Sequence, residues 1–239
     1  MTPMQANVIT LANQKGGVGK STLTMLLAGT AARRGYRVLV IGADSQGSAE
    51  RWAAAALDEA PFPAAVIGGS EFGPKLHREV GKFLQDYDVI FIDGPPAADI
   101  GITRSALLVS DLALIPTQLS PLDLYALQPF LKTVEDVRVV NEELRVRLVP
   151  NMCQLNTRIA QEVMAFLDEQ SVEATRTRVH QRTVYRAVAA YGTTIDDVGS
   201  SAPKAAREEM SALTDEVLAL VGRPELASAS TSAKAVANG

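Results

Sequence analysis

The sequence predicts an α/β fold: a doubly wound, mostly parallel sheet with helices on both faces. Short apolar runs rich in β-branched residues alternate with longer helical stretches along the chain. These runs are apolar throughout instead of alternating with polar residues, which is typical of parallel strands covered on both faces. The repeated strand–helix order favours right-handed crossovers, and these indicate a doubly wound sheet.

The expected elements follow in chain order. Strands are predicted at residues 8–12, 36–43, 64–69, 87–94, 112–118, 146–152 and 174–179. Helices are predicted at residues 21–34, 72–85, 100–109, 121–142, 156–169, 182–190 and 203–221. We expect a single domain over residues 1–223 and a disordered tail over 224–239, where small and polar residues prevail.

Composition limits the classes of function. The formal net charge of −4 argues against nucleic-acid binding by overall charge, although it does not exclude a local basic patch. The one cysteine, Cys153, excludes an internal disulfide or a cysteine-based metal site, and it fits a reducing cytoplasm. We expect Cys153 to be a small buried hydrophobic residue. The chain shows neither a signal-peptide pattern nor an apolar stretch long enough to cross a membrane.

A glycine-rich loop, KGGVGKST at residues 15–22, stands between the first predicted strand and the first predicted helix. It ends like the phosphate-binding loop G-x-x-x-x-G-K-[ST], although Gln14 stands where that pattern has its first glycine. Gly16, Gly17 and Gly19 allow successive backbone N–H groups to face phosphates. The helix N-terminus adds its positive dipole end.

Two residues at the end of this loop carry the expected nucleotide chemistry. Lys20 is expected to reach the β- and γ-phosphates, and Ser21 is expected to offer its hydroxyl to Mg²⁺. The alternative is a glycine-rich turn with a surface lysine. The strand before the loop and the amphipathic helix after it favour the phosphate-binding interpretation.

The pattern K-G-G-x-G-K-[ST] at residues 15–21 resembles the deviant Walker A motif of the ParA/MinD family of P-loop ATPases. The chain is similar to the small, ParF-like ParA type over about residues 5–221. The resemblance implies ATP and Mg²⁺ as cofactors, and an ATPase that is weak until a partner stimulates it. It implies nucleotide contacts from Lys15, Gly16, Gly17, Val18, Gly19, Lys20, Ser21, Thr22 and Asn151.

By this resemblance the first lysine of the motif, Lys15, acts in trans. It would neutralise charge on the ATP of the other subunit in a nucleotide-sandwich homodimer, as an arginine finger does. The alternative is a solvated surface lysine. The segment IPTQLSPLDL at residues 115–124 resembles the family's turn that leads into a helix at the dimer face.

Two acids match the family's remaining motifs. Asp93 ends the apolar run of FIDGPP and by resemblance would hold Mg²⁺ through its water shell. Asp44 matches the second acid of the family pattern D-x-D-P-Q and would position the attacking water. The alternatives are an acid that merely ends a strand and an acid in a turn. The resemblance therefore implies Lys15, Lys20 and Asp44 as catalytic residues and Ser21 and Asp93 as metal-site residues.

Three positions depart from the motifs of the family or match them weakly. Gly42 and Ser45 stand where relatives carry the first aspartate and the proline of D-x-D-P-Q. The sequence leaves open whether another acid compensates for Gly42. Asn151 follows the strand 146–152, where relatives contact the adenine, but asparagine is also a common turn residue.

A basic segment, RTRVHQRTVYRAV at residues 176–188, is uninterrupted by acids. Its DNA-binding candidates are Arg176, Arg178, Arg182 and Arg186. Arg182 and Arg186 are four residues apart on a predicted helix and would share a face. Arginine contacts to phosphates give salt-sensitive binding without sequence preference, and the corresponding region of ParA-type relatives binds nonspecific DNA. A solvated charged face is the alternative.

The resemblance implies a partition or positioning ATPase of the cytoplasm and nucleoid. An ATP-dependent homodimer would bind nonspecific double-stranded DNA, and a cargo adaptor would stimulate hydrolysis and release it. The cargo, a plasmid, chromosome, carboxysome or chemoreceptor cluster, is not indicated by any residue.

Three alternatives remain to be weighed. A MinD-like membrane ATPase is disfavoured because the last segment, ASASTSAKAVANG, lacks an apolar helical face. A P-loop small-molecule kinase or ligase would need a substrate pocket, for which the sequence offers no compact candidate. A nitrogenase iron-protein-like reductase needs two cluster-binding cysteines in each subunit, and this chain has one.

Overall fold

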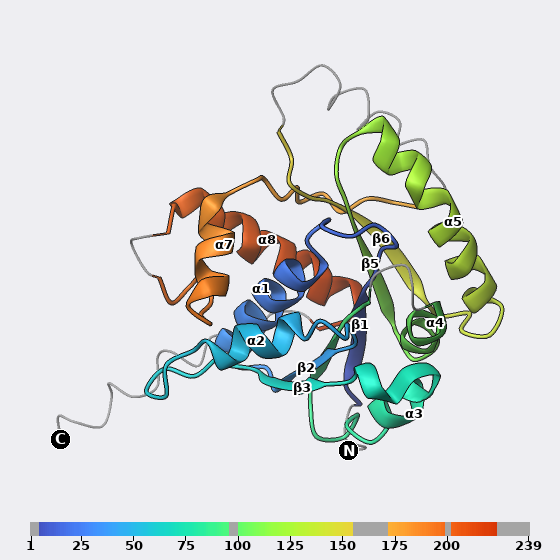
Figure 1. The fold of residues 1–239 in the computed structure, drawn as a ribbon, viewed down its shortest axis with the longest axis horizontal. Helices are drawn as coiled ribbons and strands as arrows, with labels where there is room; N and C mark the ends of the chain where they lie inside the picture. Colours follow the sequence, from blue (N-terminus) through green and yellow to red (C-terminus); the bar gives the residue numbers. More distant parts are fainter. Residues whose placement is uncertain (1–4, 96–99, 155–171, 199–201, 224–239) are drawn as a thin grey trace, which may run out of the picture.

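The computed structural model describes residues 5–95, 100–154, 172–198 and 202–223. In this part of the chain six strands form one sheet in the order β3-β2-β4-β1-β5-β6 (Figure 1). All the pairings between neighbouring strands are parallel, which confirms the predicted α/β class. The strands are β1 (Asn7–Leu11), β2 (Val38–Gly42), β3 (Ala65–Gly68), β4 (Val89–Asp93), β5 (Leu112–Thr117) and β6 (Arg145–Pro150).

Helices cover both faces of the sheet. In Figure 1, α1, α7 and α8 lie on one side of the sheet, and α4 and α5 lie on the other. The bounds are α1 (Lys20–Arg33), α2 (Ser48–Ala54), the 3₁₀ helix η1 (Ser70–Lys75), α3 (Leu76–Val80), α4 (Ile100–Leu108), α5 (Pro121–Arg138), α7 (Thr183–Ala190) and α8 (Lys204–Leu220).

The two-sided burial explains the continuous apolar runs of the strands. Successive side chains of a strand point to opposite faces. In β4, Phe91 packs in the core with α1 and α8, whereas Ile90 and Ile92 pack in the core with α3 and α4. All three are fully buried, so neither face of this strand tolerates the polar residues of a half-exposed strand.

The prediction of a strand at 174–179 is wrong. Within the described residues this segment forms isolated bridges, from Ala174 to Leu148 and from His180 to Cys153, instead of a continuous ladder. The N–H groups of Arg176 and Thr177 donate instead to the Glu216 carboxylate of α8, at 2.7 and 3.0 Å. A side chain far along the sequence thus satisfies the backbone groups that a neighbouring strand would otherwise have bound.

Two further expectations need correction, and two cannot be assessed. The predicted helix 72–85 is a 3₁₀ turn followed by the short α3, because Gly73 (φ 51°) and Pro74 interrupt the helical path. The structure also contains α2, a seven-residue helix that the sequence analysis did not predict. The predicted helix 156–169 and the predicted tail 224–239 lie outside the described residues.

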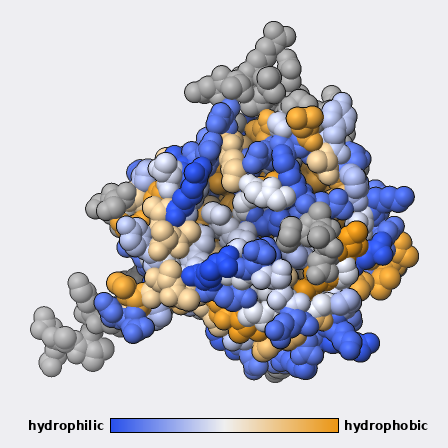
Figure 2. Space-filling model, in the orientation of Figure 1, coloured by the Kyte–Doolittle hydropathy of each residue, from blue (hydrophilic) through white to orange (hydrophobic). Residues whose placement is uncertain are grey.

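One simpler expectation is confirmed. Cys153 is buried, and this burial raises the pKa of its thiol to about 11. In the described part of the chain, helices that combine the length and apolar character needed to cross a bilayer are absent. On the face drawn in Figure 2, hydrophobic residues form small separate groups among hydrophilic ones. The assignment of residues 1–223 to one domain stays a prediction.

Candidate nucleotide-binding site

The predicted site residues meet at one edge of the sheet, where the parallel strands end. The loop 15–22 follows β1, Asp44 follows β2, Asp93 ends β4 and Asn151 follows β6. Ligands of open α/β sheets bind at this carboxyl edge. A cleft of about 580 Å³, large enough for a nucleotide, opens there. Its lining consists of Gly16, Gly17, Gly19, Lys20, Ser21, Thr22, Asp44, Ser48, Arg51, Trp52, Met152, Arg186 and Ala189.

The glycine-rich loop has the backbone of an anion-binding turn. Gly17 and Gly19 have φ angles of 73° and 90°, and Gly19 is the N-cap of α1. The first backbone N–H groups of α1 therefore lack helical partners and adjoin the cleft together with the helix dipole. Asn151 stabilises the loop, since its amide nitrogen donates to the carbonyl of Val18 at 2.7 Å. The adenine contact predicted for Asn151 stays a prediction.

Lys20 carries a positive charge into the cleft. It is 7 % exposed, and its Nζ donates to the carbonyl of Lys15 at 3.2 Å. Burial lowers the pKa of Lys20, while the negative charges of Asp93 and Asp44 act in the opposite direction. A desolvated ammonium group beside free backbone N–H groups attracts a polyanion such as a triphosphate.

Asp93 is a fully buried carboxylic acid at the end of β4. Its Oδ1 lies 3.5 Å from the Thr24 hydroxyl, and its Oδ2 lacks a hydrogen-bond partner in the described structure. Burial raises the pKa of Asp93 to about 7, although the Ser21 side chain and the charge of Lys20 act to lower it. An unpartnered buried carboxylate oxygen beside a serine hydroxyl suits a hard cation.

The residues present therefore fit Mg²⁺. Ser21 would offer its hydroxyl and Asp93 its carboxylate, directly or through water. Within the described residues there is no group of three or more His, Cys, Asp or Glu side chains placed to hold a metal. Mg²⁺ commonly takes one or two protein oxygens and completes its shell with phosphate and water, so this arrangement is the expected one.

Asp44 is fixed by the turn after β2. Its Oδ1 accepts the N–H of Gln46 at 2.9 Å, and its carbonyl accepts the N–H of Gly47 at 2.9 Å. The adjacent Ala43 donates its N–H to the carbonyl of Asp93 at 3.0 Å. The turn thus places the Asp44 carboxylate at the cleft beside the acid expected to hold the metal.

Lys15 lies outside the cleft that Lys20 occupies. Its ammonium group forms an ion pair with Asp123, in the first turn of α5, and its side chain is 42 % exposed. Asp123 is itself buried and accepts the Ser120 hydroxyl at 2.5 Å. Asp123 was not among the predicted site residues, although the S-x-x-D spacing of a helix cap marks it.

The four arginines predicted to bind DNA have different surroundings. Arg176 and Arg178 are exposed, whereas Arg182 is the N-cap of α7 and pairs with the Glu209 carboxylate at 3.0 Å. Arg186 lines the nucleotide cleft. The prediction that Arg182 and Arg186 share a helical face therefore needs correction.

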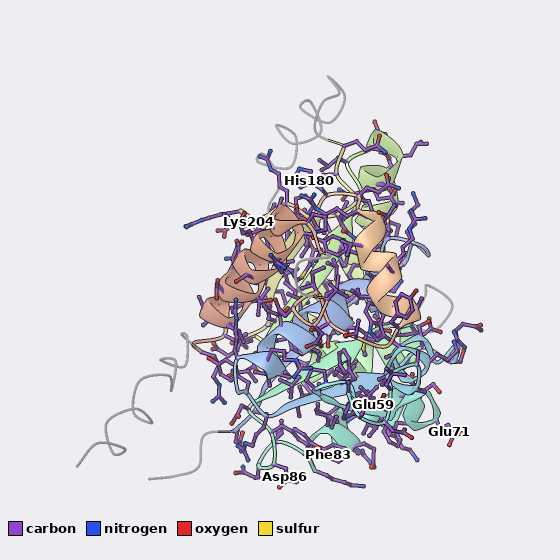
Figure 3. All side chains as sticks on the ribbon, turned by 90° about the vertical axis from the view of Figure 1, so that its left-hand side faces the viewer. Glu59, Glu71, Phe83, Asp86, His180 and Lys204 are labelled. Carbon is purple, nitrogen blue, oxygen red and sulfur yellow. The ribbon has the colours of Figure 1, made fainter. Side chains whose placement is uncertain are left out.

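The partner of Arg182 belongs to a polar cluster between α7 and α8. Glu209 also accepts from the Tyr185 hydroxyl at 2.6 Å and lies 2.5 Å from His180 Nδ1. Burial of Glu209 acts to raise its pKa, but Arg182, Tyr185 and His180 outweigh burial and lower it. Figure 3 locates this region: His180 and Lys204, the first residue of α8, lie at the opposite end of the molecule from Phe83 and Asp86. The cluster holds the Arg182 side chain against α8, so the role of Arg182 is structural.

The geometry of the site agrees with a comparison to known families. Residues 9–194 match the model of the CobQ/CobB/MinD/ParA nucleotide binding domain. The chain belongs to this family. It is a P-loop ATPase of the ParA/MinD type.

Similar proteins include two of nearly the same length. Maintenance of carboxysome distribution protein A of Halothiobacillus neapolitanus is 28 % identical over 91 % of this chain and 99 % of its own. Chromosome-partitioning ATPase Soj of Thermus thermophilus is 32 % identical over 89 % of this chain and 96 % of its own. The ATP complex of a single-residue variant of Cyanothece McdA has the same fold, with a TM-score of 0.74 at 15 % identity, covering 92 % of this chain and 98 % of its own.

Proposed function

We propose that this ParA/MinD-type ATPase is a ParA-type partition or positioning ATPase. ATP binding brings two subunits face to face, and the dimer binds nonspecific DNA. A cargo adaptor stimulates hydrolysis and so releases the dimer from the nucleoid. Relatives named for chromosome partitioning and for carboxysome distribution support this proposal, and their similar identities of 32 % and 28 % leave the cargo open between these classes.

The strongest support for the proposal is that the two lysines of the glycine-rich loop lie in different places. Lys20 is buried in its own cleft, whereas Lys15 is half-exposed and held by Asp123 at the first turn of α5. Leu122 and Tyr125, on either side of Asp123, are each 77 % exposed. A lysine beside the cleft but outside it, with large apolar side chains next to it, suits a contact with a second copy of the chain.

Hydrolysis follows from the same arrangement. Lys20 and the N-terminus of α1 bind the phosphates, and Asp44 holds the attacking water in line. Ser21 and Asp93 hold Mg²⁺, which neutralises phosphate charge when it is bound. Lys15 of the partner subunit adds positive charge to the transition state. Because this charge arrives only in the dimer, dimerisation and hydrolysis are coupled.

Lys15→Ala is expected to bind ATP within a few-fold of the original chain and to lose ATP-dependent dimers. The Lys15 side chain does not enter its own cleft, so its removal leaves the phosphate site of that subunit intact. Light scattering with ATP and with ADP measures the dimer, and a fluorescent ATP analogue measures binding. Lys82→Ala, which removes an exposed lysine paired with Glu79, is the control. Normal ATP-induced dimers in Lys15→Ala would exclude a role in trans.

DNA binding is tested with a random-sequence duplex at low salt, with ATP, with ADP and without nucleotide. We expect binding only with ATP, and a loss of at least about tenfold in Arg176→Glu/Arg178→Glu or at higher salt, because phosphate contacts release counterions. Arg182 is unsuitable for this test, since its substitution would leave the Glu209 carboxylate without its main cation. Arg78→Glu/Lys82→Glu, the same charge change at exposed residues in α3 and just after it, is the matched control.

The same measurement separates the rival functions. Equal DNA binding by the two double variants would remove Arg176 and Arg178 from the interface. Absence of DNA binding under all conditions would contradict the partition proposal. Binding of the ATP form to anionic liposomes would then favour a MinD-like membrane ATPase, and transfer of phosphate to a small molecule would favour a kinase or ligase.

A further inference from the structure

Glu50, in the first turn of α2, packs its carboxylate against two glycines at the ends of neighbouring strands. A Cβ atom added to Gly42 would lie 2.5 Å from Glu50 Oε2, and one added to Gly68 would lie 2.9 Å from Glu50 Oε1. Gly42 and Gly68 are register partners of β2 and β3. The carboxylate therefore occupies the space that side chains at these two positions would fill.

This space lies beside Asp93. Gly42 is the register partner of Asp93 on the neighbouring strand β4, and register partners of parallel strands present their side chains on the same face. The Glu50 carboxylate thus stands one strand away from that of Asp93, on the same face and at the same edge of the sheet. In agreement, the charge of Glu50 contributes to the raised pKa of Asp93, after burial and the charge of Asp44.

Each of the two carboxylates has one oxygen without a partner. Glu50 Oε2 and Asp93 Oδ2 are buried oxygens without a hydrogen-bond donor in the described structure. Leaving a buried acceptor unsatisfied costs about 1–3 kcal/mol, and more when the group is charged. Two such oxygens on the same face and at the same edge of the sheet indicate a shared partner that is positively charged or donates hydrogen bonds. Mg²⁺ with its bound water molecules has both properties.

We propose that Glu50 is a positioning residue of the magnesium site, which accepts hydrogen bonds from metal-bound water beside Asp93. It would supply from α2 the carboxylate that ParA/MinD relatives carry on the strand at the position of Gly42. The small residue at 42 and the acid at 50 then form one unit, since a side chain at 42 would collide with Glu50. The inference rests on Mg²⁺–ATP binding at the glycine-rich loop and is independent of DNA binding or cargo.

The first test measures metal binding apart from catalysis. A fluorescent ATP analogue is titrated with Mg²⁺, and with EDTA in its place, on the original chain and on Glu50→Gln. Outer hydrogen-bond partners of metal ligands typically contribute 10–100-fold to metal affinity. We expect the apparent Mg²⁺ affinity of Glu50→Gln to fall by about tenfold, with unchanged nucleotide binding in EDTA. Glu59→Gln, an exposed acid labelled in Figure 3, is the control and should behave as the original chain.

A purely structural role for Glu50 predicts a different result. The nucleotide-free Glu50→Gln variant would then unfold at lower temperature, and its nucleotide binding would weaken equally with Mg²⁺ and with EDTA. The proposal requires an unfolding temperature at least as high as that of the original chain, because the variant removes the charge of a carboxylate whose buried Oε2 lacks a hydrogen-bond partner. Unchanged Mg²⁺ affinity, or the structural pattern, overturns it.

A relocation of the acid gives the sharper test. Gly42→Asp/Glu50→Ala moves the carboxylate from α2 to the end of β2 and removes the collision. We expect this double variant to regain most of the Mg²⁺ affinity that Glu50→Ala loses. Gly42→Asp by itself should be worse than the double variant, since it crowds two carboxylates into one space. A double variant no better than Glu50→Ala would overturn the proposal, whereas a wild-type chain without Mg²⁺ dependence would contradict the nucleotide site itself.

Discussion

Asp93→Asn should lower Mg²⁺-dependent ATP hydrolysis by at least about 100-fold and should at the same time stabilise the nucleotide-free protein at pH 8. The loss of activity follows because the variant replaces the anionic oxygens that fit the metal with a neutral amide, and removal of one such electrostatic group typically costs 10²–10³-fold. The gain in stability follows because Asp93 is fully buried with an unpartnered oxygen. Function thus maintains a local arrangement that disfavours folding.

The effect of Asp93 on the free energy of unfolding depends on pH, and its sign follows from the pKa. Burial raises the pKa of Asp93 to about 7 in the folded chain, well above its ordinary value of 3.8. Between these two pH values the folded state binds a proton that the unfolded state has lost. The free energy of unfolding therefore falls as pH rises from about 4 to about 7, by at most roughly 1.4 kcal/mol for each pH unit, and this contribution is constant above pH 7.

Denaturant unfolding in EDTA between pH 5 and pH 8 measures this dependence. The difference between Asp93→Asn and the original chain should grow with pH in favour of the variant. Asp86→Asn, which changes an exposed acid of the same type, is the control. A difference that is constant with pH would show that Asp93 does not titrate in this range.

Gly19→Ala should destabilise the nucleotide-free protein by about 2–3 kcal/mol and abolish tight ATP binding. The φ angle of 90° costs an alanine about 1–2 kcal/mol. Its Cβ would also lie 2.4 Å from the Asn151 amide nitrogen and break the bond to the Val18 carbonyl, which contributes about 1 kcal/mol. The loop would then lose the shape that presents its N–H groups to phosphate.

The other loop glycines provide graded controls. Gly17→Ala meets open space but keeps a φ of 73°, so it should cost only the conformational part, about 1–2 kcal/mol. Gly16→Ala has neither a positive φ nor an atom within 4 Å and should be close to neutral. Chemical denaturation of the three variants measures the order. Equal destabilisation by all three would contradict the assignment of the cost to φ and to Asn151.

A double variant separates the two parts of the Gly19 effect. Gly19→Ala/Asn151→Ala removes the collision but retains the strained φ angle. Its destabilisation should be smaller than the sum of the two single variants, because both single variants lose the same bond to Val18. If the destabilisation of the double variant equals the sum of the two single variants, the added Cβ atom does not act through Asn151.

The sequence by itself determined those features of the protein that depend on residues close together along the chain. Apolar runs predicted all six strands of the sheet, and the inner strands β2, β4, β1 and β5 are buried at nearly every position, because burial on both faces requires apolar residues at nearly every position there. The glycine-rich loop was recognisable because phosphate binding needs particular backbone angles in consecutive residues, and Gly17 and Gly19 have those angles. Asp93 was recognisable because it ends an apolar run and matches a motif of the family that the chain resembles.

The tertiary structure decided which side chains meet across elements. The pairing of Lys15 with Asp123 joins residues 108 positions apart, and the pairing of Arg182 with Glu209 joins two helices. Segment 174–182 forms isolated bridges instead of a strand, and carboxylates of α8 bind its backbone between and beside them, a contact that no local pattern encodes. Glu50 was equally hidden, since its position over Gly42 depends on α2 packing against strand ends. Spacing along the chain specifies backbone shape, whereas the partner of a charged side chain is specified only by the fold that brings distant segments together.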